Sequence, residues 1–266
     1  MPQENLTHSL IHPTAIIDPS AELADDIQVG PYTVIGAKVK IDSGNKIASH
    51  VVINGPTLIG KDNEFFQFSS IGEAPQDKKY QGEDTHLVIG DRNIIREFTT
   101  LNRGTTQDRG TTSLGNDNLI MAYVHIAHDC IVGNNIILAN NVALAGHVSI
   151  HDHAILGGFS LVHQFCTIGS YVFSAMNSVI SKDVPPYLMI AGHMAKPHGL
   201  NVEGLKRHGF SSDTIKAMRA AYKALYRLNL TFDDAITEIN ELATNCEELS
   251  LMIEFLSNDV TRGIVR

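Results

Sequence analysis

The sequence from Leu119 to Val148, LIMAYVHIAHDCIVGNNIILANNVALAGHV, carries a large aliphatic residue at every sixth position from Ile120 onward. A period of six matches neither the 3.6-residue period of a helix nor the two-residue alternation of a simple strand. It is the hexapeptide repeat of a parallel β-helix, in which each hexad forms one flat side of a triangular coil. Three hexads close a coil, so residues eighteen apart in the sequence are expected to stack directly above one another.

The repeat extends over most of the chain. Its apolar positions run without interruption through residues 11–71, continue in the same phase through 89–101, and resume after a slip of one residue over 114–180, where Ser174 is the one polar occupant. Glycine often follows the apolar residue, which we attribute to a tight corner with unusual backbone dihedrals. Small residues four positions after the apolar one, including Cys130 and Cys166, are expected to fill the corners of the interior.

Two polar segments interrupt the hexads, at about residues 73–87 and 102–113. Because the phase survives the first break, this segment is interpreted as a loop extruded from an intact coil. Long loops on a rigid scaffold often carry functional residues. A solvated excursion without function remains the alternative, more so for the second segment than for the first.

The repeat ends at the sequence DVPP, residues 183–186, because two prolines cannot join a parallel ladder. Beyond it, apolar residues at spacings of three and four predict helices that begin near Ser211 and Thr231, and a further helix over 247–256. The sequence therefore predicts an all-β parallel β-helix with two extruded loops over residues 1–190, followed by a small α-helical domain over residues 191–266.

Composition limits the classes of function. The chain has 266 residues, a net charge of −9 and no long basic run, which argues against nucleic acid as its partner. No apolar stretch is long enough to span a membrane, and the amino terminus lacks the pattern of a secretory signal. The three cysteines are an odd number without metal-type spacing. We therefore expect a cytoplasmic protein.

Three histidines are expected on one face of the prism. His128, His147 and His163 follow apolar residues that differ by eighteen, and the column above His128 contains Gly146 and then Gln164. An imidazole next to a glycine backbone that can be approached closely is a plausible general base. From the residues alone two alternatives stay open: a polar contact between subunits, and a zinc site shared by histidines of adjacent subunits.

A second column, on a different side of the prism, contains Asn140, Gly158 and Met176 on successive coils. Glycine leaves space along the wall, and the methionine closes this space one coil later. A groove with such a floor could measure the length of an inserted chain.

Several motifs together resemble one family. They are AHD at 127–129, ILANNVALAGHV at 137–148, VHQFC at 162–166, DVPPY at 183–187 and NVEGLKR at 201–207. The combination resembles the UDP-N-acetylglucosamine acyltransferases that begin lipid A (lipopolysaccharide) synthesis, and the match covers essentially the whole chain. The resemblance implies a left-handed β-helix and a homotrimer with active sites in the clefts between subunits. It also implies transfer of a 3-hydroxyacyl chain from acyl carrier protein to the 3-hydroxyl of UDP-N-acetylglucosamine, with no metal and no cofactor.

The resemblance also implies roles for individual residues. His128 matches the general base, Asp129 would orient it, and the backbone N–H of Gly146 matches the oxyanion donor. Other positions would line the cleft or contact the nucleotide sugar: Asp77, Lys79, His125, His147, His163, Gln164, Asn201, Glu203 and Arg207. His208 stands where family members often have a second arginine. Met176 falls where members that accept longer chains have glycine, so we expect a preference for shorter chains.

Three competing functions lead to different expectations. The related N-acyltransferase of the same pathway carries an additional amino-terminal domain, whereas the hexads here begin by Ile11. A zinc hydratase on the same kind of prism would contain stoichiometric metal, and activity that survives chelators would count against it. A non-catalytic binding solenoid would tolerate His128→Ala, and the NVEGLKR motif makes this function the least expected.

Overall fold

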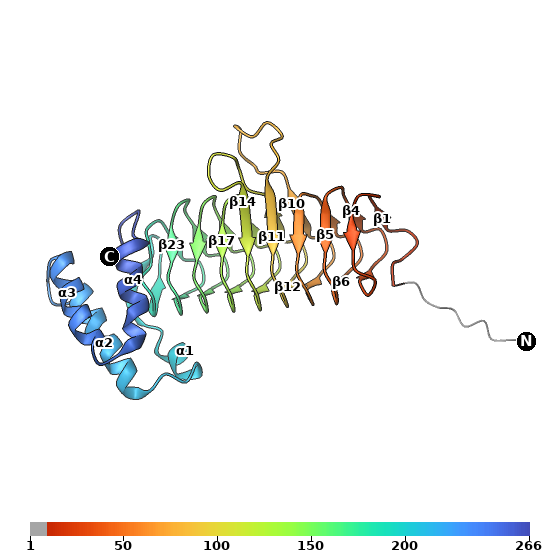
Figure 1. Cartoon of the computed structure of the whole chain (residues 1–266). Helices are drawn as coiled ribbons and strands as arrows, with labels where there is room; N and C mark the ends of the chain where they lie inside the picture. The colour runs from red at the N-terminus through yellow and green to blue at the C-terminus, as the bar shows by residue number, and fades with distance from the viewer. Residues whose placement is uncertain (1–9) are drawn as a thin grey trace, which may run out of the picture.

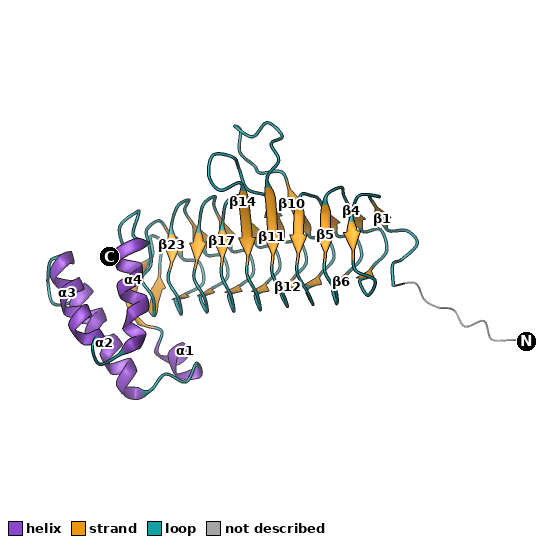
Figure 2. Cartoon of the chain, in the orientation of Figure 1, coloured by secondary structure: helices purple, strands orange, loops and turns teal. Residues whose placement is uncertain are grey.

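The computed structural model describes residues 10–266, which form a three-sided prism of parallel strands followed by a group of helices (Figure 1). Figure 2 shows the short strands stacked side by side along the prism and the helices gathered beyond its carboxy-terminal end. The amino-terminal residues 1–9, on which the expectation about a secretory signal partly depends, lie outside the described residues.

Each hexad supplies one strand to one of three sheets, in rotation. The first sheet contains β1 (Ile16–Ile17), β4 (Val34–Ile35), β7 (Val52–Ile53), β10 (Ser70–Glu73), β13 (Thr100–Asn102), β16 (His125–Ile126), β19 (Ala143–Leu144), β22 (Leu161–Val162) and β25 (Val179–Ile180). The second contains β2 (Glu22–Leu23), β5 (Val39–Ile41), β8 (Thr57–Ile59), β11 (His86–Ile89), β14 (Thr111–Leu114), β17 (Ile131–Val132), β20 (Ser149–Ile150) and β23 (Thr167–Ile168). The third contains β3 (Gln28–Val29), β6 (Lys46–Ile47), β9 (Glu64–Phe65), β12 (Ile94–Ile95), β15 (Leu119–Ile120), β18 (Ile137–Leu138), β21 (Ile155–Leu156), β24 (Phe173–Ser174), β26 (Leu188–Ala191) and β27 (Lys196–Leu200).

The strands pair in the eighteen-residue register that the sequence predicts. Ile126 pairs with Leu144, and Leu144 with Val162, so their hexads lie on one side of three successive coils. These side chains point inward and are at most 3 % exposed, because removing apolar surface from water is the main force that holds the prism together. The predicted left-handed parallel β-helix is confirmed, both by this topology and by the solved structures described below.

The polar and thiol side chains of the interior are accommodated without a special role. Ser174 is fully buried, and its hydroxyl bonds the Ser160 hydroxyl at 2.8 Å and accepts the N–H of Gly157 at 3.0 Å. Cys130 and Cys166 are fully buried corner residues, and burial raises the pKa of each thiol to about 12. Both thiols therefore stay protonated and act as small core residues, as predicted.

Among the glycines that directly follow the apolar residue, the expected unusual dihedral occurs at Gly72, with a φ of 74°, and is wrong for the others. Left-handed φ angles occur instead at non-glycine residues three positions after the apolar one, such as Asp129 at 60° and His147 at 64°. Glycines that directly follow the apolar residue are needed for space: a Cβ on Gly30 would lie 2.7 Å from the backbone of Ala48, and one on Gly157 would lie 2.6 Å from the Ser174 carbonyl. The next coil therefore packs directly against the backbone at these positions.

Both polar insertions leave the same corner of the prism, between the first and second sheets. One connects β10 to β11 through residues 74–85, and the other connects β13 to β14 through residues 103–110 (Figure 1). The two loops touch: the Arg103 guanidinium donates to the Tyr80 hydroxyl at 3.0 Å, and Lys79 Nζ donates to Gln107 at 3.3 Å. β11 keeps the register with both of its neighbours, whereas the pairing of β10 with β13 shifts between Ile71 and Glu73, where the first loop begins. The coils continue on both sides, so the loops are extruded from the prism as predicted.

Strands continue beyond the double proline before the helices begin. β26 extends the third sheet, and β27 pairs with it antiparallel, so helical structure begins at Val202 rather than near residue 191. The helical elements are α1 (Val202–Arg207), α2 (Ser212–Tyr226), α3 (Phe232–Ala243), the 3-10 helix η1 (Glu247–Leu249) and α4 (Ser250–Asn258). The Ser211 and Thr231 hydroxyls cap α2 and α3 by accepting the N–H groups of Thr214 and Asp234. None of the helices in residues 10–266 is long and apolar enough to cross a bilayer.

Candidate active site

His128 and Gly146 meet at the corner between the first and second sheets. Both residues lie two positions past paired apolar residues, Ile126 on β16 and Leu144 on β19. A Cβ on Gly146 would lie 2.6 Å from Cε1 and 2.8 Å from Nε2 of His128, so the imidazole rests against the glycine backbone. The Gly146 N–H donates no hydrogen bond within residues 10–266. The predicted column is therefore present, with its N–H free for a ligand.

Asp129 orients this imidazole. His128 Nδ1 lies 2.9 Å from Asp129 Oδ2, and the carboxylate is completely buried whereas the His128 side chain is 16 % exposed. An ionised carboxylate only accepts hydrogen bonds, so Nδ1 carries the proton and the Nε2 lone pair is left for substrate. Burial alone would raise the pKa of Asp129, but hydrogen bonds from His128 and Thr105 together hold it below its ordinary value.

The second loop holds Asp129 from the other side. The backbone N–H and the hydroxyl of Thr105 donate to its two oxygens at 2.9 and 2.7 Å, and its own N–H donates to the Thr112 hydroxyl at 2.8 Å. Asp108 of the same loop accepts from His147 Nδ1 at 2.7 Å. Sequence reasoning missed Thr105, Asp108 and Thr112. One feature of the sequence pointed to this segment: both breaks in the repeat follow strands on the side of the prism that carries His128.

His147 and His125 flank His128. The rings of His128 and His147 meet edge to face with centroids 5.1 Å apart, and Phe165 stacks on His147 at 4.4 Å. His125 Nδ1 bonds the Thr100 hydroxyl at 2.7 Å, and burial, with a smaller contribution from His128, lowers the pKa of His125. The lowered pKa favours the neutral form of His125, and the two histidines form one polar wall beside His128.

His163 and Gln164 are exposed and do not join this cluster. No hydrogen bond or ring contact within residues 10–266 connects either side chain to His128 or His147, and His163 Nδ1 lies 3.2 Å from the Gln164 carbonyl. His163 stands one position past Val162, whereas the corner positions lie two and three past the apolar residue. The stacked position above His147 is therefore occupied by Phe165.

The first loop and α1 carry the other predicted residues, away from the base. Asp77 accepts the N–H of Lys79 at 3.0 Å within the first loop. Asn201 caps α1 by accepting the Gly204 N–H and also donates to the Tyr171 carbonyl at 3.1 Å, while Glu203 pairs with Lys206. The side chain of Arg207 has no polar partner within the described chain. One protomer does not bring these residues into contact with His128.

His208, which ends α1, belongs to an aromatic cluster. Its ring meets His153 at 4.9 Å and Tyr171 at 5.1 Å, both edge to face, and His153 stacks on Tyr171 at 4.7 Å. Burial, followed by the effect of His208, lowers the pKa of His153. The cluster ties α1 to the end of the prism.

The predicted groove column stands on a different corner, between the third and first sheets. Asn140, Gly158 and Met176 each lie two positions past paired residues of β18, β21 and β24. A Cβ on Gly158 would lie 3.3 Å from the Asn140 carbonyl, and Met176 is 77 % exposed. The column is continuous, but in one protomer it is separated from His128 by the width of the first sheet.

His128, Asp129 and His147 could in principle hold a metal ion, because their ligand atoms lie within 4.8 Å of one another. Several of these atoms are already hydrogen-bonded. Both Nδ1 atoms face carboxylates, and both Asp129 oxygens accept from Thr105. The geometry therefore fits a hydrogen-bonded base better than a ligand set.

The fold and this site define a hexapeptide-repeat transferase. A family profile described as bacterial transferase hexapeptide (six repeats) matches residues 111–146, and one described as UDP-N-acetylglucosamine O-acyltransferase, domain 2, matches residues 183–265.

Individual relatives are more specific. A protein of Thiobacillus denitrificans named acyl-(acyl-carrier-protein)–UDP-N-acetylglucosamine O-acyltransferase is 53 % identical over 96 % of this chain and 99 % of its own length. One of the same name from Saccharophagus degradans is 55 % identical over 97 % of this chain and all of its own length.

Solved structures agree. The UDP-N-acetylglucosamine O-acyltransferase of Moraxella catarrhalis has a TM-score of 0.94 and is 50 % identical, covering 97 % of this chain and 100 % of that one. The Francisella novicida UDP-N-acetylglucosamine acyltransferase also has a TM-score of 0.94, at 44 % identity, covering 96 % of this chain and 94 % of that one. The chain belongs to the acyl-(acyl-carrier-protein)–UDP-N-acetylglucosamine O-acyltransferase family and is an O-acyltransferase.

Proposed function

We propose that this protein transfers a 3-hydroxyacyl chain from acyl carrier protein to the 3-hydroxyl of UDP-N-acetylglucosamine, the first step of lipid A synthesis. The names of the relatives support the acyl donor and the acceptor. The geometry around His128 supports the chemistry, because acyl transfer to a hydroxyl needs a base, an oxyanion donor and no bound electrophile.

His128 is the general base of the proposed reaction. Its Nε2 takes the proton of the sugar hydroxyl while that oxygen attacks the thioester carbonyl. The ionised Asp129, bonded to Nδ1 at 2.9 Å, stabilises the imidazolium that forms. The negative oxygen of the tetrahedral intermediate accepts the free N–H of Gly146. As the intermediate collapses, the carbon–sulfur bond breaks and the imidazolium returns its proton to the leaving thiolate.

The active site of the proposed enzyme is completed by a neighbouring subunit of a homotrimer. The base and the groove column lie on two different corners of one prism, so a single chain cannot bring an acyl group to both. Met176 and Phe159 beside the groove are 77 % and 59 % exposed, more than expected for apolar side chains that work in isolation. Packing the corner that carries His128 against the corner of the next protomer that carries Met176 covers these side chains. It also places the base beside the groove.

His125 and His147 contact the nucleotide sugar near the base. Asn201, Glu203 and Arg207 contact it from the region of α1. Asp77 and Lys79 of the first loop close the cleft of the trimer together with His163 and Gln164. Arg207 is the candidate for a phosphate contact, since its guanidinium has no polar partner within residues 10–266 and can bind phosphate with two N–H groups. Met176 floors the acyl groove and favours shorter chains. The free buried cysteines fit a reducing compartment such as the cytoplasm.

The observation that carries this proposal is the contact of the Asp129-bound imidazole with the Gly146 backbone. The test is acyl transfer from a series of 3-hydroxyacyl carrier proteins to UDP-N-acetylglucosamine, with wild type and His128→Ala. We expect a sharp chain-length optimum for wild type and a loss of about 10²- to 10⁴-fold in kcat for the variant.

A matched control is His12→Ala, because His12 is exposed at the amino-terminal end of the prism and, within residues 10–266, its side chain bonds only Thr14. It should retain full activity, and both variants should keep the oligomeric state of the wild type. Wild-type activity that His128→Ala leaves unchanged would remove the proposed base. Absence of transfer to UDP-N-acetylglucosamine by the wild type would remove the proposed acceptor.

A further inference from the structure

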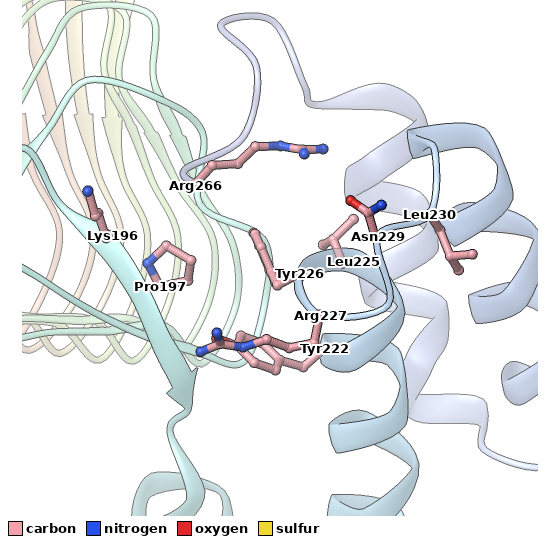
Figure 3. Close-up of a pocket in the computed structure, with 9 residues that line it drawn as sticks. All are labelled: Lys196, Pro197, Tyr222, Leu225, Tyr226, Arg227, Asn229, Leu230 and Arg266. Atoms are coloured by element: carbon pink, nitrogen blue, oxygen red, sulfur yellow. The ribbon is translucent and has the colours of Figure 1, made fainter.

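The helical end of the molecule contains a pocket of about 350 Å³ that the proposed acyl transfer does not use. One side is formed by Lys196 and Pro197 of β27, and the other by residues at the end of α2 and in the turn that follows it, with Arg266 across the opening (Figure 3). Its lining residues are Lys196, Pro197, Tyr222, Leu225, Tyr226, Arg227, Asn229, Leu230 and Arg266. Pockets of this size hold small ligands.

The charged side chains that line this pocket are all basic. Lys196, Arg227 and Arg266 come from three different segments, and the lining contains no acidic side chain. Within residues 10–266 none of the three forms an ion pair or a side-chain hydrogen bond. The chain as a whole carries a net charge of −9, so three unpaired cations around one cavity run against its composition. Arg227 follows the carboxy-terminal end of α2 and could compensate the negative end of that helix dipole. Lys196 and Arg266 belong to other segments, so this explanation does not apply to them.

A buried hydroxyl points to the same kind of ligand. The Tyr226 Oη is buried and has no hydrogen-bond partner within the described chain. Leaving a buried polar group unpaired is costly, and such groups often mark a missing ligand or ion. Burial, followed by the neighbouring Tyr222 and only partly offset by Arg266, raises the pKa of Tyr226. The hydroxyl therefore keeps its proton and can donate to an acceptor.

The floor of the pocket is apolar and aromatic. Tyr222 and Tyr226 have ring centroids 5.1 Å apart, and Pro197 and Leu225 lie on either side of Tyr226 (Figure 3). An anion bound by the three cations would leave its carbon part against these side chains. A bare ion would leave the apolar floor uncovered.

We infer that this pocket is a second ligand site, which binds a small organic phosphate: the phosphate accepts from Arg227, Arg266, Lys196 and the Tyr226 hydroxyl, and the organic part packs on Tyr222 and Pro197. Guanidinium groups bind phosphate through paired N–H donors, and Tyr226 supplies an additional neutral donor. The site is independent of the acyl transfer proposed above, since none of its residues belongs to the cluster around His128.

Binding of phenyl phosphate to the whole protein, followed by isothermal titration calorimetry, tests this site. Inorganic phosphate and phenol serve as comparison probes, because the first lacks the organic part and the second lacks the anion. We expect phenyl phosphate to bind more tightly than either, with an affinity that falls as salt concentration rises. Equal binding of phenol would overturn the role of the cations, and equal binding of inorganic phosphate would overturn the organic part.

Variants separate this site from a structural role. Arg266→Gln should weaken phenyl phosphate at least about 10-fold, whereas Lys216→Gln, an exposed charge of α2 outside the pocket, should change nothing. Tyr226→Phe should weaken the ligand about 3- to 10-fold, yet leave the Tm of the unliganded protein equal or higher, because it removes an unpaired hydroxyl. A lower Tm with unchanged affinity would show that the hydroxyl has only a structural role and would overturn the assignment.

Saturating UDP-N-acetylglucosamine should not displace phenyl phosphate from the wild type. Displacement would place the pocket within the nucleotide-sugar site and overturn its independence. This readout is binding rather than turnover, so a failure here is distinguishable from a failure of the proposed acyl transfer.

Discussion

Gly146→Ala is the sharpest test of the geometry around the base. The added Cβ would lie 2.6 Å from Cε1 and 2.8 Å from Nε2 of His128, whereas carbon atoms pack comfortably at about 3.5–4.0 Å. The backbone at Gly146 does not have a positive φ, so alanine itself is tolerated there. The imidazole must therefore move by about 1 Å. A shift of that size lengthens the 2.9 Å bond to Asp129 toward the point where it ceases to be a hydrogen bond.

The expected loss follows from this displacement. A misplacement of about 1 Å at the reacting centre can cost about 100-fold in rate, which corresponds to about 2.7 kcal/mol in the activation free energy. Because the oxyanion donor is a backbone N–H, alanine retains it, so the variant tests the position of the ring alone. The assay is kcat/KM for acyl transfer, with Tm and oligomeric state measured in parallel.

The control for this substitution is Gly36→Ala. Its added Cβ would lie 3.1 Å from the Asn54 side-chain oxygen and at ordinary van der Waals distances, 3.5 and 3.6 Å, from the backbone of Ile53 and Asn54, so it meets no imidazole and needs only a small adjustment. The double variant Gly146→Ala with His128→Ala should be no slower than His128→Ala alone, because both changes act through one imidazole. Full activity of Gly146→Ala with an unchanged Tm would refute the reasoning, and so would fully additive losses in the double variant.

Three further predictions concern the groove, metal and pH. Met176→Gly should move the chain-length optimum toward longer acyl groups. The transfer rate for a chain two methylenes longer should rise about 15-fold, since each buried methylene contributes about 0.8 kcal/mol, and an unchanged optimum in the same series of donors contradicts the groove column. Dialysis against a chelator should leave kcat unchanged, because the Nδ1 atoms of His128 and His147 are bonded to carboxylates, and activity restored only by added zinc argues for a metal site. The lowered pKa of His153 means that the unfolded chain binds this proton more readily, so calorimetry at fixed protein concentration should record a falling Tm between pH 7.5 and 5.5. His153→Phe, which can still stack on Tyr171, should reduce that slope, and an unchanged slope contradicts the assignment.

The repeat made the fold and the central contact predictable from sequence. In a parallel β-helix the ladder transmits register from coil to coil, so a count of eighteen is enough to place Gly146 against His128 and Met176 beyond Gly158. The left-handed dihedral expected for the repeated glycines holds at Gly72 alone; at most of the other glycines that follow an apolar residue, close approach by the next coil excludes a side chain.

The conformation of the two loops could not be predicted from the six-residue repeat. Thr105 and Asp108 reach Asp129 and His147 from a segment without periodicity, and only three-dimensional closure of that loop brings them there. His163 was expected beside the other histidines because it shares their side of the prism. One position along a strand decides whether a side chain lies on the flat wall or at the corner, and Phe165 holds the corner position above His147.

The uniform register limits how such a molecule can change its length. An insertion of eighteen residues adds one coil and leaves all three sheets aligned, whereas a shorter insertion within a strand would turn core side chains toward water. The separation between the histidine corner and the helical end can therefore change only in discrete increments of about 4.8 Å, the spacing of neighbouring strands. Corners are exempt, because residues 74–85 and 103–110 extend outward and the ladders beside them shift only locally, between Ile71 and Glu73. This architecture can therefore evolve in two separate ways. Added or lost coils change the distance between the histidine corner and the helical end, and changes in the corner segments alter the residues around the site.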